Sequence, residues 1–155
     1  MIAVIGACDR ATLSYPTGPV ETMLPLQIQS TRNPDYERIG GAEKVHLLAD
    51  RFYALMDELP QAREVRGIHP ADLGGSRQKL YEFLSGWLGG PQLYVEKHGE
   101  PKLRARHQPF AIGDDERDQW LLCMRTALNE VVADDELRER LYANLKKIAD
   151  HIRNV

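Results

Sequence analysis

The sequence predicts an all-α protein built on four main helices. From Gly40 onward, apolar side chains recur at spacings of three and four residues, which is the period of an amphipathic helix. No stretch alternates between apolar and polar residues with the period of two that marks a strand, and no internal repeat is visible. The 155 residues fit one ordinary domain, and 43% apolar with 28% charged residues excludes collagen-like, disordered and membrane classes.

The first two helices have clear boundaries. The first covers about residues 42–58, because it follows the pair Gly40-Gly41 and ends at Pro60. Its apolar stripe consists of Val45, Leu48, Phe52, Leu55, Met56 and Leu59. The second helix follows the turn at residues 72–75 and stops at Gly89-Gly90-Pro91, a strong break. One of its faces carries Ser76, Leu80, Phe83 and Trp87.

A long connection separates the second helix from the third. Residues 89–113 contain several prolines and glycines, and only residues 102–107 could form a helical turn or two. A loop longer than about 12–15 residues is uncommon in a compact domain and is usually functional. We therefore expect this segment to carry part of a site.

The last two helices are predicted from their first turns and their stripes. The third begins at Asp114-Asp115-Glu116, the acidic first turn that a helix dipole favours. Its inward stripe is Trp120, Met124, Ala127, Leu128 and Val131. Asp134 can cap the fourth helix, on which Leu137, Leu141, Leu145, Ile148 and Ile152 form one line.

Residues 1–34 are expected to form a flexible extension, and residues 35–155 the folded domain. Prolines and a glycine interrupt residues 9–34 of the extension, and these residues have no sustained period. Its residues 5–8 loosely match a lipoprotein cleavage box, but no basic residue precedes them. Met23 is an alternative start of the chain.

Charge and cysteine content restrict the partners and the location. A net charge of −3 argues against a dedicated nucleic-acid binder. The longest uncharged apolar run, residues 1–7, is far short of the ~20 residues that span a bilayer. Cys8 and Cys123 form neither a disulfide framework nor a zinc site, which suits a reducing cytoplasm. We expect a cytoplasmic protein with neither a nucleic-acid nor a membrane partner.

The common catalytic signatures are missing, and His107 is the residue that could carry chemistry. There is no glycine-rich phosphate loop, no Gly-x-Ser-x-Gly and no His-Glu-x-x-His. A lone histidine is usually a surface or structural residue, and spacing alone would assign His107 to that class rather than to the metal ligands. However, aromatic stripes, a long basic loop and one inward histidine would suit a planar apolar cofactor with a metal centre.

Five motifs occur in order along the chain and together resemble the group II truncated haemoglobins. They are Gly40-Gly41-Ala42; Arg51-Phe52-Tyr53; Phe83-Leu84 with Trp87 and Gly89-Gly90-Pro91; Arg104-x-Arg106-His107-x-Pro109-Phe110-x-Ile112; and Arg117-Asp118-x-Trp120-x-x-Cys123-Met124. The resemblance covers about residues 34–152. It implies a two-over-two helical sandwich around haem b, in which the helix carrying the proximal histidine is reduced to a loop with one turn. The segment 89–113 is consistent with that reduction.

The resemblance also implies the roles of individual residues. His107 corresponds to the proximal ligand of the haem iron. The distal pocket would contain Tyr53, Trp120, His69, Ser76 and Leu80. Without the resemblance, Tyr53 and Trp120 would be read as core residues, and His69 is alternatively an exposed loop histidine.

Other residues would hold the haem itself. Lys79, Tyr94 and Arg106 match family positions that contact the haem propionates through charge-assisted bonds. The remaining haem-binding residues would be Phe52, Phe83, Leu103, Phe110, Ile112 and Met124. His46, His98 and His151 are assigned to the surface or to structure.

The function that follows is reversible binding of O₂, and of CO or NO, at a histidine-ligated iron. Hydrogen-bond donors Tyr53, Trp120 and His69 around the ligand slow its release, which favours storage, scavenging or sensing over delivery. An alternative is a haem enzyme, peroxidase-like or a nitric oxide dioxygenase, although no catalytic residue is apparent. A second alternative is a haem-free helical interaction module. An unidentified electron donor is expected, with the protein a monomer or homodimer.

Overall fold

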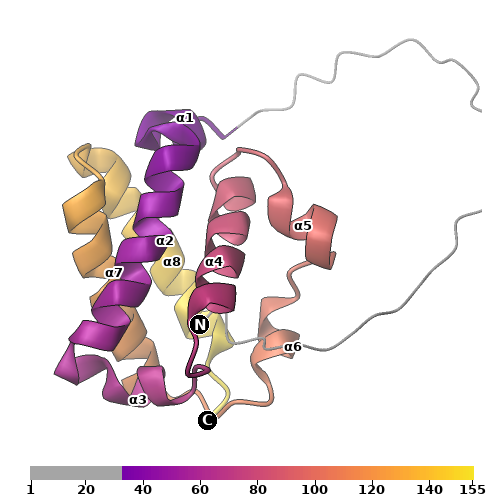
Figure 1. Ribbon diagram of the computed structural model, residues 1–155, viewed down its shortest axis with the longest axis vertical. Helices are drawn as coiled ribbons and strands as arrows, with labels where there is room; N and C mark the ends of the chain where they lie inside the picture. Colours follow the sequence, from indigo (N-terminus) through magenta and orange to yellow (C-terminus); the bar gives the residue numbers. More distant parts are fainter. Residues whose placement is uncertain (1–32) are drawn as a thin grey trace, which may run out of the picture.

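The computed structural model describes residues 33–155, and within that range it contains helices and no strand (Figure 1). Four long helices make the core: α2 (Gly41–Glu58), α4 (Gly74–Trp87), α7 (Asp114–Val131) and α8 (Asp135–Ile152). Helix α2 packs on α4 and on α7, and α7 packs on α8, so that two helix pairs form a two-over-two sandwich. The all-α prediction and its four main helices are confirmed. The lipoprotein-like residues 5–8, Cys8, Met23 and most of the expected extension lie outside the described residues.

The ends of the long helices follow the predicted chemistry. Gly40 has φ +114° and is the residue between α1 (Asp35–Ile39) and α2, a left-handed conformation that glycine adopts without strain. Asp134 caps α8, since its side chain accepts a hydrogen bond from the Leu137 backbone N–H at 3.0 Å. At the start of α7 the Glu116 carboxylate accepts from the Gly113 N–H at 2.9 Å.

Short helices occur in the connections between the long helices. The chain after α2 forms η1 (Pro60–Ala62) and α3 (Arg63–Gly67), and the 89–113 segment contains α5 (Leu93–His98) and α6 (Leu103–His107). The turn at 102–107 was predicted, whereas α5 was not. Figure 1 shows α5 and α6 outside the four-helix core, on the side of α4.

Polar contacts attach the short helices to the long ones. The buried Asp35 carboxylate of α1 accepts two hydrogen bonds from the Arg140 guanidinium of α8, at 2.7 and 2.8 Å. The Gln119 side chain of α7 accepts from the backbone N–H groups of Glu64 and Val65, at 3.0 and 3.1 Å. These N–H groups belong to the first turn of α3 and have no partner within their own helix.

The core is continuous and contains the one cysteine in the described range. Cys123 is fully buried on α7, and burial raises the pKa of its thiol to about 11, so it remains a protonated apolar side chain. None of the helices described is both long and apolar enough to cross a membrane.

Candidate functional site

Four aromatic side chains meet in the protein interior. Two lie on α2 and one on α7, and the fourth is His69, which follows the end of α3. Phe52 and Tyr53 lie on the buried stripe of α2, and their ring centroids are 4.8 Å apart. The Phe52 ring lies 5.2 Å from that of Trp120, and the Tyr53 ring 5.7 Å from that of His69. The exposed fractions of all four are between 0% and 7%. The structure thus brings together three of the predicted distal residues.

Three polar atoms of this cluster are buried without a well-formed hydrogen bond to the described residues: Tyr53 Oη, His69 Nε2 and Trp120 Nε1. An unsatisfied buried polar group costs about 1–3 kcal/mol. Such groups are rare in native proteins, and each calls for an explanation such as a missing ligand or water. Three of them in one aromatic cluster indicate a binding pocket for a small polar ligand.

His69 is buried rather than exposed in its loop, and its Nε2 atom is a hydrogen-bond acceptor within the aromatic cluster. Its Nδ1–H donates to the Val65 carbonyl at 2.7 Å, because a carbonyl can only accept. Burial lowers the pKa of His69 to about 3, so the ring is neutral and Nε2 carries the lone pair. Arg66 fixes the same loop by donating to the carbonyls of Pro70 and Ala71, each at 3.0 Å. In this tautomer His69 offers a ligand an acceptor, whereas the sequence predicts a donor at this position.

Tyr53 keeps its proton. Burial raises the pKa of the phenol well above its usual value, and interaction with the Ser76 side chain opposes that effect only in part. Ser76 and Leu80 lie one turn apart on α4, and both are buried. These two residues of the predicted distal face therefore lie in the interior, with Ser76 beside Tyr53.

His107 is fully buried at the end of α6. Its Nδ1–H donates to the Leu103 carbonyl one turn earlier, at 2.5 Å. This bond fixes the ring orientation, and in the neutral imidazole it places the lone pair on Nε2, which is the form that ligates metals.

A residue that the sequence analysis missed, Asn154, holds the segment after His107. Its side-chain amide donates to the carbonyls of His107 and Phe110 at 3.1 and 2.9 Å, and its oxygen accepts from Ile112 N–H at 3.0 Å. A single asparagine near the end of the chain gives no periodic or motif signal, so only the fold could identify it.

A cationic group lies between α4 and α6. Arg106 lies over the Tyr94 ring of α5, 5.9 Å from its centroid. Lys79 of α4 is half-buried; burial lowers the pKa of its ammonium, and the nearby positive charge of Arg106 lowers it further. Two cations that repel each other beside a buried tyrosine are a suitable place for a carboxylate. We call Lys79, Tyr94 and Arg106 the cationic cluster.

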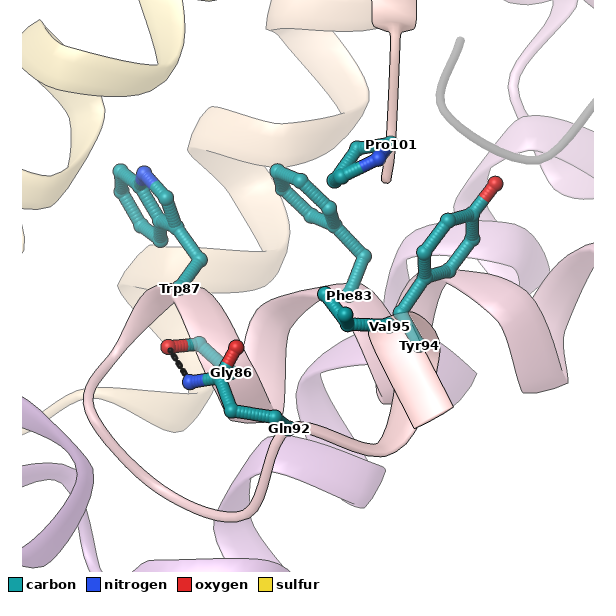
Figure 2. Close-up of a pocket in the computed structure, with 7 residues that line it drawn as sticks. All are labelled: Phe83, Gly86, Trp87, Gln92, Tyr94, Val95 and Pro101. Carbon is teal, nitrogen blue, oxygen red and sulfur yellow. Dashed lines mark hydrogen bonds between the residues drawn. The ribbon is translucent and has the colours of Figure 1, made fainter. Parts of the chain in front are cut away.

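A small cavity of about 170 Å³ lies next to this cluster. Phe83 of α4 and Tyr94 of α5 line it, with their ring centroids 6.3 Å apart and edge to face. Figure 2 shows Trp87 and Pro101 on the same cavity, with the Phe83 ring between them. Of the other expected haem contacts, Ile112 and Met124 are fully buried, whereas Leu103 and Phe110 pack partly buried against the core.

These residues fit a haem group. The anchored imidazole of His107 would supply a nitrogen ligand to the haem iron, and the cationic cluster would match the acidic side chains of the porphyrin. In the described part of the chain no group of three or more His, Cys, Asp or Glu could hold a metal by itself. A single histidine suits an iron that a porphyrin already holds. The remaining histidines are elsewhere: His46 bonds Asp50 at the surface, His98 bonds Glu82, and His151 is exposed.

A two-over-two helical sandwich with a buried histidine and a polar aromatic pocket defines a truncated globin. The model of the bacterial-like globin family matches residues 35–154, and the chain belongs to that family. It is a group II truncated haemoglobin and hence a globin haem protein.

Relatives from two bacteria agree with this family assignment. The group II 2-on-2 haemoglobin from Agrobacterium tumefaciens is 49% identical with a TM-score of 0.77, over 83% of this chain and 98% of that one. The group 2 truncated haemoglobin YjbI of Bacillus subtilis is 42% identical over 79% of this chain and 89% of its own. A structure described as a truncated oxygen-avid haemoglobin from Bacillus subtilis is 41% identical with a TM-score of 0.70, over 77% and 98% of the two chains.

Proposed function

We propose that this chain binds haem b through His107, and that the haem-loaded protein reversibly binds O₂, and also CO and NO. The observation that carries the proposal is the set of three polar atoms without a well-formed hydrogen bond, on Tyr53, His69 and Trp120, within one buried aromatic cluster. A ligand placed among them would give the two donors an acceptor.

When bound, haem supplies an iron that coordinates a diatomic gas reversibly. The chain's own contribution on the proximal side is the orientation of His107. Because Nδ1–H is bonded to the Leu103 carbonyl, the Nε2 lone pair has a fixed direction. Asn154 holds the backbone on both sides of the turn that follows, at the His107 and Phe110 carbonyls.

On the distal side Tyr53 and Trp120 act as donors, because the phenol stays protonated and indole N–H can only donate. Hydrogen bonds to a charged acceptor contribute about 1.5–3 kcal/mol, which corresponds to roughly ten- to a hundredfold slower release of a ligand that becomes negatively polarised. The relative described as oxygen-avid supports this expectation. Slow release suits storage, scavenging or sensing rather than delivery.

The cationic cluster would hold the haem propionates, and apolar side chains would cover the porphyrin faces. These apolar residues are Phe52, Leu80, Phe83, Leu103, Phe110, Ile112 and Met124. The proposal also includes a cytoplasmic location and an external electron donor that keeps the iron ferrous.

The test is the O₂ dissociation rate measured by stopped flow in the haem-loaded protein. We expect Tyr53→Phe to release O₂ roughly ten- to a hundredfold faster, since it removes one charge-assisted donor and little volume. His69→Phe is the matched comparison, and we expect a smaller effect because Nε2 of His69 accepts. Failure to bind one haem per chain refutes the proposal, and an unchanged rate in Tyr53→Phe refutes the distal role of Tyr53.

A further inference from the structure

A buried carboxylate outside the proposed haem pocket, that of Glu82, joins α4 to α5. Its side chain is 2% exposed. One oxygen accepts hydrogen bonds from Gln78 at 2.9 Å and from Lys97 at 2.5 Å, and the other accepts from the Nε2–H of His98 at 2.9 Å. Burial by itself raises the pKa of Glu82, but the hydrogen bonds more than offset it, so the pKa lies below its usual value and the group is ionised.

The connection continues from α5 to the residue next to His107. The backbone carbonyl of His98 accepts a hydrogen bond from the Arg106 guanidinium at 3.0 Å. The His98 ring also lies 4.8 Å from the Tyr94 ring, over which Arg106 is placed. Two of the three members of the cationic cluster are thus in contact with His98, and His98 is bonded to Glu82.

The third member is coupled to Glu82 through charge. The negative charge of Glu82 raises the pKa of Lys79, whereas Arg106 lowers it. Glu82 lies three residues after Lys79 on α4, so the two are neighbours on one side of the helix. Glu82 is therefore connected to Tyr94 and Arg106 through His98, and to Lys79 through charge.

We infer that Glu82 is a positioning residue for the cationic cluster: through His98 and Lys97 it fixes α5 on α4, and thereby sets Tyr94 and Arg106 for a carboxylate ligand. This inference rests on the proposed function, because the carboxylates are those of haem. Only the Glu82 side chain of this group is buried, since the side chains of Lys97 and His98 are 54% and 30% exposed. Ion pairs with exposed partners contribute little to stability, which favours a positioning role for Glu82.

The experiment compares two porphyrins, iron protoporphyrin IX and its dimethyl ester, whose propionates are blocked. Each is loaded into the full-length protein, and its rate of transfer to an excess of apomyoglobin is measured. In Glu82→Gln, we expect loss of the free-acid form to be about tenfold faster, equivalent to about 1.4 kcal/mol. Loss of the dimethyl ester should keep its unsubstituted rate. Glu139→Gln is the control for the loss of a carboxylate charge on another helix. Glu139 on α8 pairs with Arg125 on α7, away from the cationic cluster, and both rates should be unchanged.

A second variant keeps the test decisive if Glu82→Gln does not fold. His98→Phe retains a ring beside Tyr94 and removes only the Nε2–H donor to Glu82. It should likewise accelerate loss of the free acid alone. Equal acceleration of both porphyrins in these variants, or none, overturns the inference and leaves Glu82 a structural group. Equal loss of both porphyrins from the unsubstituted protein instead refutes the propionate contacts in the proposed function.

Discussion

Replacing Trp120 by phenylalanine tests whether its indole N–H donates a hydrogen bond to a bound ligand or whether the side chain only packs in the core. Trp120 is 2% exposed and packs against Phe52, and its Nε1–H has no partner among the described residues. Phenylalanine loses apolar contacts, which we estimate to cost about 1–3 kcal/mol. It also removes a buried unsatisfied donor, which returns about 1–3 kcal/mol. The two terms oppose each other, so the free energy of unfolding of the ligand-free protein should change by only about 1 kcal/mol.

The same substitution should have a large effect on ligand release. Loss of one donor to a charged acceptor removes about 1.5–3 kcal/mol, so O₂ should dissociate roughly ten- to a hundredfold faster. The assay is stopped-flow displacement of O₂, together with urea unfolding of the same preparations. Trp87→Phe is the control, because Trp87 lies on α4 at the small cavity and is expected to leave the rate unchanged. A large loss of stability with an unchanged O₂ rate would refute the reasoning and make Trp120 a packing residue.

Three further outcomes are expected. Because unfolded histidine binds a proton near pH 6.5 and folded His69 only near pH 3, its contribution to stability is fully present above pH 6.5 and is lost as pH falls. Urea unfolding between about pH 4 and 6.5 should therefore show a pH slope up to about 1.4 kcal/mol per unit shallower in His69→Phe; parallel slopes would contradict this. Arg140→Met should lower the free energy of unfolding by about 1–3 kcal/mol, because it leaves the buried Asp35 carboxylate without its donor, and an unchanged free energy would show that the pair is dispensable. A chain beginning at Asn33 should still bind one haem, since the family match starts at residue 35; failure to load haem would assign the preceding segment a role in the domain.

The long helices could be predicted because the apolar stripe and the end signals of each helix lie within its own sequence. The stripe on residues 42–58 and the cap at Asp134 are local signals, and the structure has a helix at both. Helix α5 could not be predicted in this way, because six residues are too few to establish a helical period. It forms where Glu82, distant in sequence, provides an acceptor for Lys97 and His98.

The candidate site shows the same division. Motif order was sufficient to single out His107, Tyr53 and Trp120, and all three side chains are buried. The role of His69 depends on which ring nitrogen reaches a carbonyl, and that contact is made by the loop geometry rather than by residue type. Asn154 acts through tertiary contacts with a segment more than forty residues earlier, which no local pattern encodes.

The most direct test of the central claim is the ferrous absorption spectrum of the protein loaded with one equivalent of haem. We predict a Soret band typical of a five-coordinate, histidine-ligated globin in the unsubstituted protein. In His107→Gly that spectrum should be lost, and added imidazole should restore it, because the free base supplies the same nitrogen ligand. A His107→Gly protein that retains haem with the unsubstituted spectrum, before any imidazole is added, would contradict the assignment of His107 as the proximal ligand.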